Sequence, residues 1–99
     1  ASEGVRFTDA LSIYPVCSPF RAMLMTGRYP MANGTVYNDV GLKDGLPTIG
    51  KVCKEHGYAT GYIGKWHLEW NRNPFVPEDR RQGFDAIKTL AVRGAQRVI

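Results

Sequence analysis

The chain has 99 residues, of which 43% are hydrophobic and 22% charged, values typical of a globular domain. This length allows one domain at most, and so short a chain buries only about two-thirds of its surface. The formal net charge is +4, but the basic residues are scattered, and only Arg80 and Arg81 form a doublet. No nucleic-acid partner is therefore expected. No apolar run approaches the ~20 residues of a membrane span, so none is predicted.

The first predicted elements are an extended segment and a helix. Residues 5–11 roughly alternate and contain β-formers, which indicates a short strand or extended segment. Ser18 followed by Pro19 predicts a helix start, with Ser18 as N-cap and Pro19 at the first helical position. Gly27 is a natural C-terminal glycine for this helix. Residues 29–45 are rich in glycine, asparagine and aspartate and predict a surface loop.

A second helix and a strand are predicted next. Thr48 caps the helix and Gly57 ends it, and an apolar stripe follows the i, i+3, i+4, i+7 spacing of one helix face. The stripe consists of Ile49, Val52, Cys53 and His56. Residues 58–63 are largely apolar and predict a strand buried on both faces. A helix that leads into a strand is an α/β pattern, and ligands gather at the strand's C-terminal end.

The end of the chain carries weaker signals. Residues 71–82 are polar and charged and contain proline, which predicts a loop. A weak helix is predicted from Ala86 onward. Cys17 and Cys53 lie far apart, without the C-x-x-C or paired histidine spacing of a zinc site. A disulfide between them stays open at this stage, but two cysteines do not make a disulfide scaffold.

Cys17 lies directly before the N-terminus of the first predicted helix. Unpaired backbone N–H groups and the helix dipole there favour an anion, either a thiolate or a bound oxyanion. Arg21 follows one turn later on the same side of the helix. Such a site can hold a reactive side chain beside a fixed positive charge. The same spacing also fits a buried structural cysteine near a surface arginine, so the pair alone does not decide.

Two motifs resemble segments of one enzyme family. Residues 17–28 read CSPFRAMLMTGR, which resembles the C-x-P-x-R signature and T-G-R ending of the formylglycine-dependent sulfatases. Residues 64–68 read GKWHL and resemble the sulfatase segment that brings a lysine and a histidine to the sulfate. Gly83-Phe84-Asp85 is also familiar in these enzymes. The chain thus resembles the N-terminal region of a sulfatase of the alkaline-phosphatase-like superfamily.

The resemblance implies a fold as well as a function. It spans about residues 3–85, while residues 86–99 resemble nothing in the family. It implies that residues 1–99 are part of a catalytic domain, a three-layer α/β/α structure with a mostly parallel sheet. Many members of the family are exported, periplasmic or lysosomal, which leaves the compartment of this chain unknown.

The chemistry implied by the resemblance is the hydrolysis of sulfate esters. A formylglycine-generating enzyme converts Cys17 to formylglycine, and one hydroxyl of the hydrated aldehyde attacks sulfur. Arg21 holds the formylglycine, and Lys65 bridges it to the sulfate oxygens. His67 contacts the formylglycine hydroxyl and is the candidate base for sulfate release. In an extended segment Lys65 and His67, two positions apart, project to the same face.

The family site also contains a divalent cation, usually calcium, which prefers several oxygen ligands. In the family these come mainly from segments before and after the part that this chain resembles. Cys17, as formylglycine, is the one residue here that maps to a metal-ligand position. Five aspartates do not occur in the family's metal-ligand motifs and are interpreted as loop or surface carboxylates: Asp9, Asp39, Asp44, Asp79 and Asp85.

Other notable residues have a structural interpretation. Cys53 lies on the apolar stripe and is interpreted as a core residue. His56 ends the same stripe and is interpreted as a helix-C-terminal histidine. Trp66 and Trp70 are interpreted as packing residues near the mouth of the site, or as substrate contacts.

Two alternatives remain open at this stage. The first is a phosphonate or phosphate diester hydrolase of the same superfamily, which can use the same formylglycine motif. The second is a non-catalytic α/β fragment in which Cys17 is an unmodified thiol. We expect the 99-residue chain alone to be inactive, because most of the family's metal ligands are missing from it.

Overall fold

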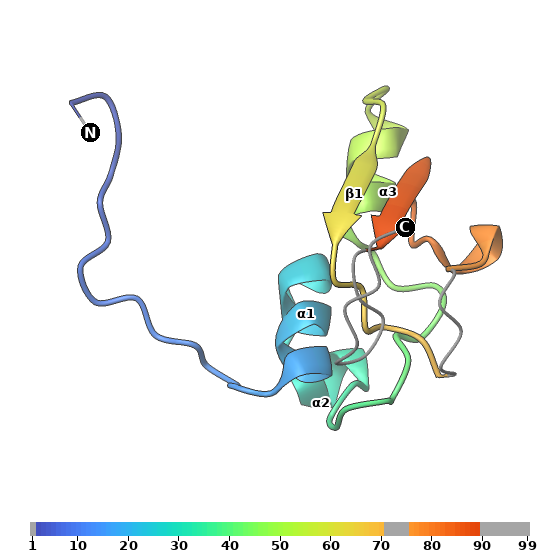
Figure 1. Cartoon of the computed structure of the whole chain (residues 1–99), viewed down its shortest axis with the longest axis horizontal. Coiled ribbons are helices and arrows are strands. Elements are labelled where there is room, and N and C mark those ends of the chain that lie inside the picture. The colour runs from blue at the N-terminus through green and yellow to red at the C-terminus, as the bar shows by residue number, and fades with distance from the viewer. Residues whose placement is uncertain (1, 71–75, 90–99) are drawn as a thin grey trace.

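The computed structural model describes residues 2–70 and 76–89 and shows a small mixed α/β unit (Figure 1). The two strands pair in parallel, with Gly61 opposite Ala86 and Gly64 opposite Thr89. α1 packs against both other α-helices. In chain order the elements are α1 (Cys17–Thr26), α2 (Pro30–Asn33), α3 (Ile49–Glu55), β1 (Gly61–Gly64), the 3-10 helix η1 (Glu78–Arg80) and β2 (Ala86–Thr89). The predicted α/β class is confirmed, since the unit combines helices with a small parallel sheet.

The N-terminal segment does not form the strand that was one expectation for residues 5–11. It runs as an irregular extended trace away from the helices and the sheet (Figure 1). Val5, Phe7 and Leu11 are 81%, 80% and 91% exposed. Among the described residues no strand pairs with this segment, and a strand is stable only when its backbone groups are paired with a neighbour.

α1 begins two residues earlier than the sequence predicts, at Cys17 and not at Pro19. Val16 is the N-cap and makes no side-chain hydrogen bond to the helix. Ser18, predicted as the cap, lies inside the first turn, and its backbone N–H donates to Asn38 Oδ1 over 2.9 Å. A side chain from a distant loop therefore caps this helix in place of Ser18. The predicted end is confirmed: Gly27, at φ 65, donates its N–H to the Met23 carbonyl.

The segment after α1 is more ordered than the predicted surface loop. It contains α2, which starts with Pro30 at its first turn and ends before Gly34 at φ 82. Asn33 is fully buried. Its amide donates to the Arg28 carbonyl and accepts from the Thr35 backbone N–H, both over 2.8 Å. In the sequence a polar asparagine favours a surface loop. In the structure both ends of the Asn33 amide are bonded to backbone groups, so the side chain can be buried without water.

α3 has the predicted cap but not the predicted buried face. Thr48 Oγ1 accepts the Lys51 backbone N–H, which confirms the cap. Ile49 and Val52 of the apolar stripe, however, are 56% and 45% exposed. The one buried residue of α3 is Gly50, where an added Cβ would lie 3.0 Å from the Phe84 ring. The helix therefore packs inward through its smallest residue and leaves most of the stripe uncovered.

The first strand is shorter than predicted, and the sheet contains a second strand that was not predicted. β1 occupies Gly61–Gly64, not residues 58–63, and Ile63 is 76% exposed, so the strand is not buried on both faces. β2 at Ala86–Thr89 replaces the helix predicted from Ala86. Pairing with β1 outweighs the weak local helical preference there. Residues 71–75 of the predicted loop and residues 90–99 lie outside the described part of the chain.

The core lies between α1, the loop before α3 and the residues that follow β1. Trp66 is at its centre, fully buried, with edge contacts to Tyr62 at 5.1 Å and to Phe84 at 6.1 Å between ring centroids. The fully or nearly fully buried apolar residues are Ala22, Met25, Leu42, Trp66, Leu68 and Val76. Trp66 is thus a packing residue, as predicted, whereas Trp70 is 60% exposed.

Asp85 fastens the start of β2 to the start of β1. Its carboxylate accepts from Thr60 N and from Thr60 Oγ1, each over 3.0 Å. Its own backbone N–H donates to the Thr60 carbonyl over 3.0 Å. Lys54 Nζ, at the end of α3, lies 2.7 Å from the same carboxylate. Gly83, at φ 94, lets the segment before β2 pass close to the backbone of α3, because a Cβ there would lie 2.3 Å from Lys51 N.

The Asp85 contacts predict an acid-sensitive component of stability. The hydrogen bond from Lys54, followed by those from Thr60, lowers the pKa of Asp85 from its ordinary value of 3.8 to about 2. Because the folded pKa lies below the unfolded one, this stabilisation is present above 3.8 and is lost as the pH falls toward about 2. Asp85→Asn should remove that pH dependence, as measured by urea unfolding across this range.

The exposed carboxylate Asp79 provides the matched control. Asp79→Asn should keep the wild-type dependence of the unfolding free energy on pH. If Asp85→Asn and the wild type lose stability equally as the pH falls, the proposed role of the Lys54–Asp85–Thr60 contacts is wrong.

Candidate active site

Cys17 is the first residue of α1, and its side chain is exposed. Both cysteines are free, so the disulfide left open by the sequence does not form in this structure. Cys53 is half-buried and only partly meets the prediction of a core residue. His56 is the C-cap of α3, and its Nδ1 lies 2.8 Å from the Val52 carbonyl, which confirms its helix-terminal role.

Arg21 joins α1 to the residues that follow β1. Its guanidinium donates to the Lys65 backbone carbonyl over 2.6 Å and to the Tyr62 hydroxyl over 3.3 Å. The Tyr62 hydroxyl donates to the same Lys65 carbonyl. Arg21 Nε is buried and has no hydrogen-bond partner among the described residues. The two bonds from Nη1 therefore hold the guanidinium in place, while the buried Nε–H is left unpaired.

Ser18 makes a second connection between the same two segments. Its hydroxyl donates to the His67 backbone carbonyl over 2.8 Å, and both residues are buried. α1 is thus fastened through its first turn to residues 65–67. These bonds bring the first turns of α1, which carry Cys17 and Arg21, next to the backbone of Lys65 and His67.

His67 occupies an unusual backbone conformation and a nearly buried position. Its φ is 54, so the extended alternation expected for Lys65 and His67 does not continue through it. The side chain is 7% exposed, and Nε2 lies 3.1 Å from Asp39 Oδ1. Nδ1 is buried without a hydrogen-bond partner among the described residues. Asp39 was interpreted as a loop carboxylate, and no motif signalled its contact with His67.

A buried polar network lies behind the site. Glu69 is 7% exposed and accepts from Trp66 Nε1 over 3.2 Å and from Arg80 Nε over 3.1 Å. Arg80 also donates to the Leu42 carbonyl over 2.9 Å and pairs with Asp44. Arg80 thus connects the Trp66–Glu69 segment to the loop that contains Leu42 and Asp44. These additional contacts offset the desolvation cost of burying the Arg80–Glu69 ion pair.

The described residues do not assemble a metal site of their own. They contain no group of three or more His, Cys, Asp or Glu side chains that could hold a metal ion. Calcium takes six to eight oxygen ligands, with carboxylates prominent among them. The donor set of the described residues is therefore too small to hold calcium by itself.

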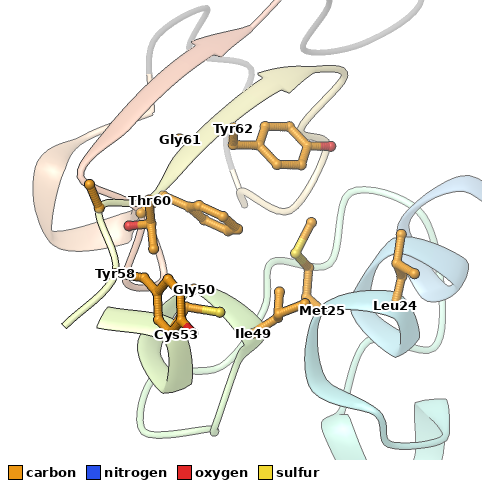
Figure 2. Close-up of a pocket in the computed structure, with 11 residues that line it drawn as sticks. Leu24, Met25, Ile49, Gly50, Cys53, Tyr58, Thr60, Gly61 and Tyr62 are labelled. Carbon is orange, nitrogen blue, oxygen red and sulfur yellow. The ribbon is translucent and has the colours of Figure 1, made fainter. Parts of the chain in front are cut away.

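A separate hollow of about 470 Å³ lies between α1, α3 and β1 (Figure 2). Leu24 and Met25 border it from α1, Ile49 and Cys53 from α3, and Tyr62 from β1 (Figure 2). Its lining is mostly apolar and includes none of Cys17, Lys65 and His67. Cys17, Lys65 and His67, three of the predicted site residues, therefore do not line this apolar hollow. In the described part of the chain, no helix is long and apolar enough to cross a membrane.

Comparisons with known proteins agree with the motifs and with the fold. The family model described as Sulfatase matches residues 1–95, so the chain belongs to the sulfatase family. An ulvan-active sulfatase of Formosa agariphila is 46% identical over 91 residues, which cover 91% of this chain and 18% of that protein. Arylsulfatase G of Canis lupus familiaris is 44% identical over 90 residues, with coverage of 86% and 16%.

A solved structure is similar over the same region. The crystal structure of yidJ from Bacteroides fragilis, described as a candidate sulfatase, aligns with a TM-score of 0.77 at 39% identity. The alignment covers 87% of this chain and 24% of that one. The chain therefore spans less than a quarter of the length of these relatives.

The bond from Ser18 to the His67 carbonyl gives a direct test of the site's framework. Ser18→Ala should lower the free energy of unfolding by about 1–3 kcal/mol, because it leaves a buried carbonyl without its donor. Urea unfolding measures the change. Ser12→Ala, in the exposed N-terminal segment, is the matched control and should have little effect. Equal effects of the two substitutions would show that the bond does not hold the two segments together.

Proposed function

We propose that this chain carries the nucleophile-bearing part of a sulfatase catalytic domain, and that the complete protein hydrolyses sulfate esters. The main support is the attachment of the first turn of α1 to residues 65–67, which gathers the residues of both motifs at one place. A sulfate ester carries negative charge over several oxygens. Its hydrolysis therefore needs fixed positive groups and a strong nucleophile.

Each motif residue has a part in this proposal. Cys17 is exposed, which suits access by a formylglycine-generating enzyme. Once modified, it supplies a hydrated aldehyde whose hydroxyl attacks sulfur and whose second hydroxyl permits release of sulfate. Arg21 offers its buried, unpartnered Nε to the oxyanion that forms there. Lys65 provides the second positive charge, and His67 exchanges protons at residue 17.

Calcium is part of the proposal, but this chain supplies little of its site. Position 17, as formylglycine, is the one ligand that we assign here. The remaining oxygen ligands would come from other segments of the complete domain. When bound, the cation would neutralise negative charge on the sulfate.

The exposed apolar surface supports the proposal that residues 1–99 are part of a larger three-layer α/β/α domain. Ile49 and Val52 of α3 and Ile63 of β1 are about half exposed or more. A sheet of two short strands, such as β1 and β2, is marginal unless further strands or helices cover it. Additional elements of a complete domain would cover these side chains and the hollow of Figure 2.

Turnover of 4-nitrophenyl sulfate by the complete protein, with calcium present, tests the proposed activity. We expect Cys17→Ala to reduce turnover to background, because no other group can replace the nucleophile. Cys53→Ala, which removes the half-buried second thiol, is the matched control and should retain activity. Intact mass should show the small fixed decrease that accompanies conversion of the Cys17 thiol to an aldehyde.

Two results would favour other functions. Faster turnover of a phosphonate or phosphate diester than of the sulfate ester would assign the protein to the related hydrolases. An unmodified thiol at Cys17, together with no turnover of any ester, would indicate a non-catalytic member of the family.

The 99-residue chain alone should show no turnover of 4-nitrophenyl sulfate, even with calcium. The physical reason is that its described residues offer no cluster of metal ligands, and the positive groups it contains are too few to neutralise a sulfate. The chain and the complete protein would be assayed at equal concentration. Turnover by the chain above that of its Cys17→Ala variant would contradict the proposal that the site requires further segments.

A further inference from the structure

We propose that Asp39 is a positioning residue that fixes the ring proton of His67 on Nε2 and leaves Nδ1 to exchange protons at residue 17. The inference rests on the proposed function, since it assumes that His67 acts on residue 17. Asp39 belongs to neither of the two motifs. It lies in the segment between α2 and α3, and it reaches the site only through folding.

The contact itself determines which nitrogen carries the proton. Asp39 Oδ1 lies 3.1 Å from His67 Nε2. An ionised carboxylate can only accept hydrogen bonds, so Nε2 must carry the hydrogen in this contact. In the neutral ring, Nδ1 then has a free lone pair. Nδ1 is buried and without a hydrogen-bond partner among the described residues. This is the state expected of a nitrogen whose partner is the modified residue 17.

The backbone holds the two residues in this arrangement. Asp39 and His67 have φ values of 62 and 54, in the left-handed region that residues other than glycine seldom adopt. His67 and Asn38, the residue before Asp39, are both tied to the first turn of α1: Asn38 Oδ1 accepts the Ser18 N–H, and the Ser18 hydroxyl donates to the His67 carbonyl. The chain of contacts from Asn38 through Ser18 and His67 to Asp39 therefore closes beside Cys17.

This arrangement has a chemical consequence for proton transfer. When Nδ1 accepts the proton of a hydroxyl at residue 17, the electrons of the O–H bond stay on oxygen and the ring becomes positively charged. The Asp39 carboxylate, next to Nε2, stabilises that charge. Without Asp39 the ring could also place its proton on Nδ1, where it cannot accept another. A carboxylate that holds a histidine in one tautomer has the same effect in serine hydrolases.

The experiment uses the complete protein with Asp39→Asn, because an amide can donate to Nε2 and so favour the wrong tautomer. We expect kcat for 4-nitrophenyl sulfate to fall roughly 10-fold or more. KM should stay nearly constant, since Asp39 does not contact the substrate in this proposal. Asp39→Glu keeps a carboxylate and should restore part of kcat. Asp79→Asn, at an exposed carboxylate in η1, is the matched control and should leave kcat unchanged.

A spectroscopic readout separates positioning from a merely structural role. The ¹⁵N shifts of the ring nitrogens, assigned by the signals lost in His67→Gln, report the tautomer. We expect hydrogen on Nε2 in the wild type and a shift toward Nδ1 in Asp39→Asn. Hydrogen on Nδ1 in the wild type, or an unchanged kcat in Asp39→Asn, would overturn the inference.

The failure of the proposed function would look different. In that case the wild-type protein itself would show no turnover of the sulfate ester. The wild-type tautomer would still test the Asp39–His67 contact, because it requires no activity. Should Asp39→Asn fail to fold, the wild-type shifts and the Asp39→Glu variant retain the test.

Discussion

Two hydrogen bonds from α1 to the chain after β1 organise this structure. Ser18 donates to the His67 carbonyl and Arg21 to the Lys65 carbonyl. Both acceptors are backbone groups, so the side chains of Lys65 and His67 stay available for other contacts. The exposed thiol of Cys17 lies immediately before the first of these donors. A helix terminus and a strand end that are distant in sequence thereby form one polar site.

The segment that follows β1 divides its residues between packing and chemistry. Trp66 and Leu68 are fully buried in the core. The Trp66 indole is further fixed by Glu69, which Arg80 neutralises. Because these buried side chains are held firmly, the backbone of the neighbouring polar residues Lys65 and His67 has a well-defined position. Precise positions of this kind are what catalytic groups require.

Much of the remaining surface is apolar and open. The stripe of α3 and the hollow between α1, α3 and β1 have no covering layer among the described residues. The chain spans less than a quarter of the length of its sulfatase relatives. Burial of this surface by other parts of a complete domain would add the hydrophobic stabilisation that a small unit cannot provide by itself.

The sequence by itself determined the features that depend on neighbouring residues: the Thr48 cap, the Gly27 end of α1 and the family motifs. It could not locate β2, because a short strand beginning at Ala86 is stabilised by pairing with β1 and not by local preference. Nor could it find the partner of His67. Only the tertiary structure brings Asp39 to that ring, since the contact joins two loops that no spacing rule connects.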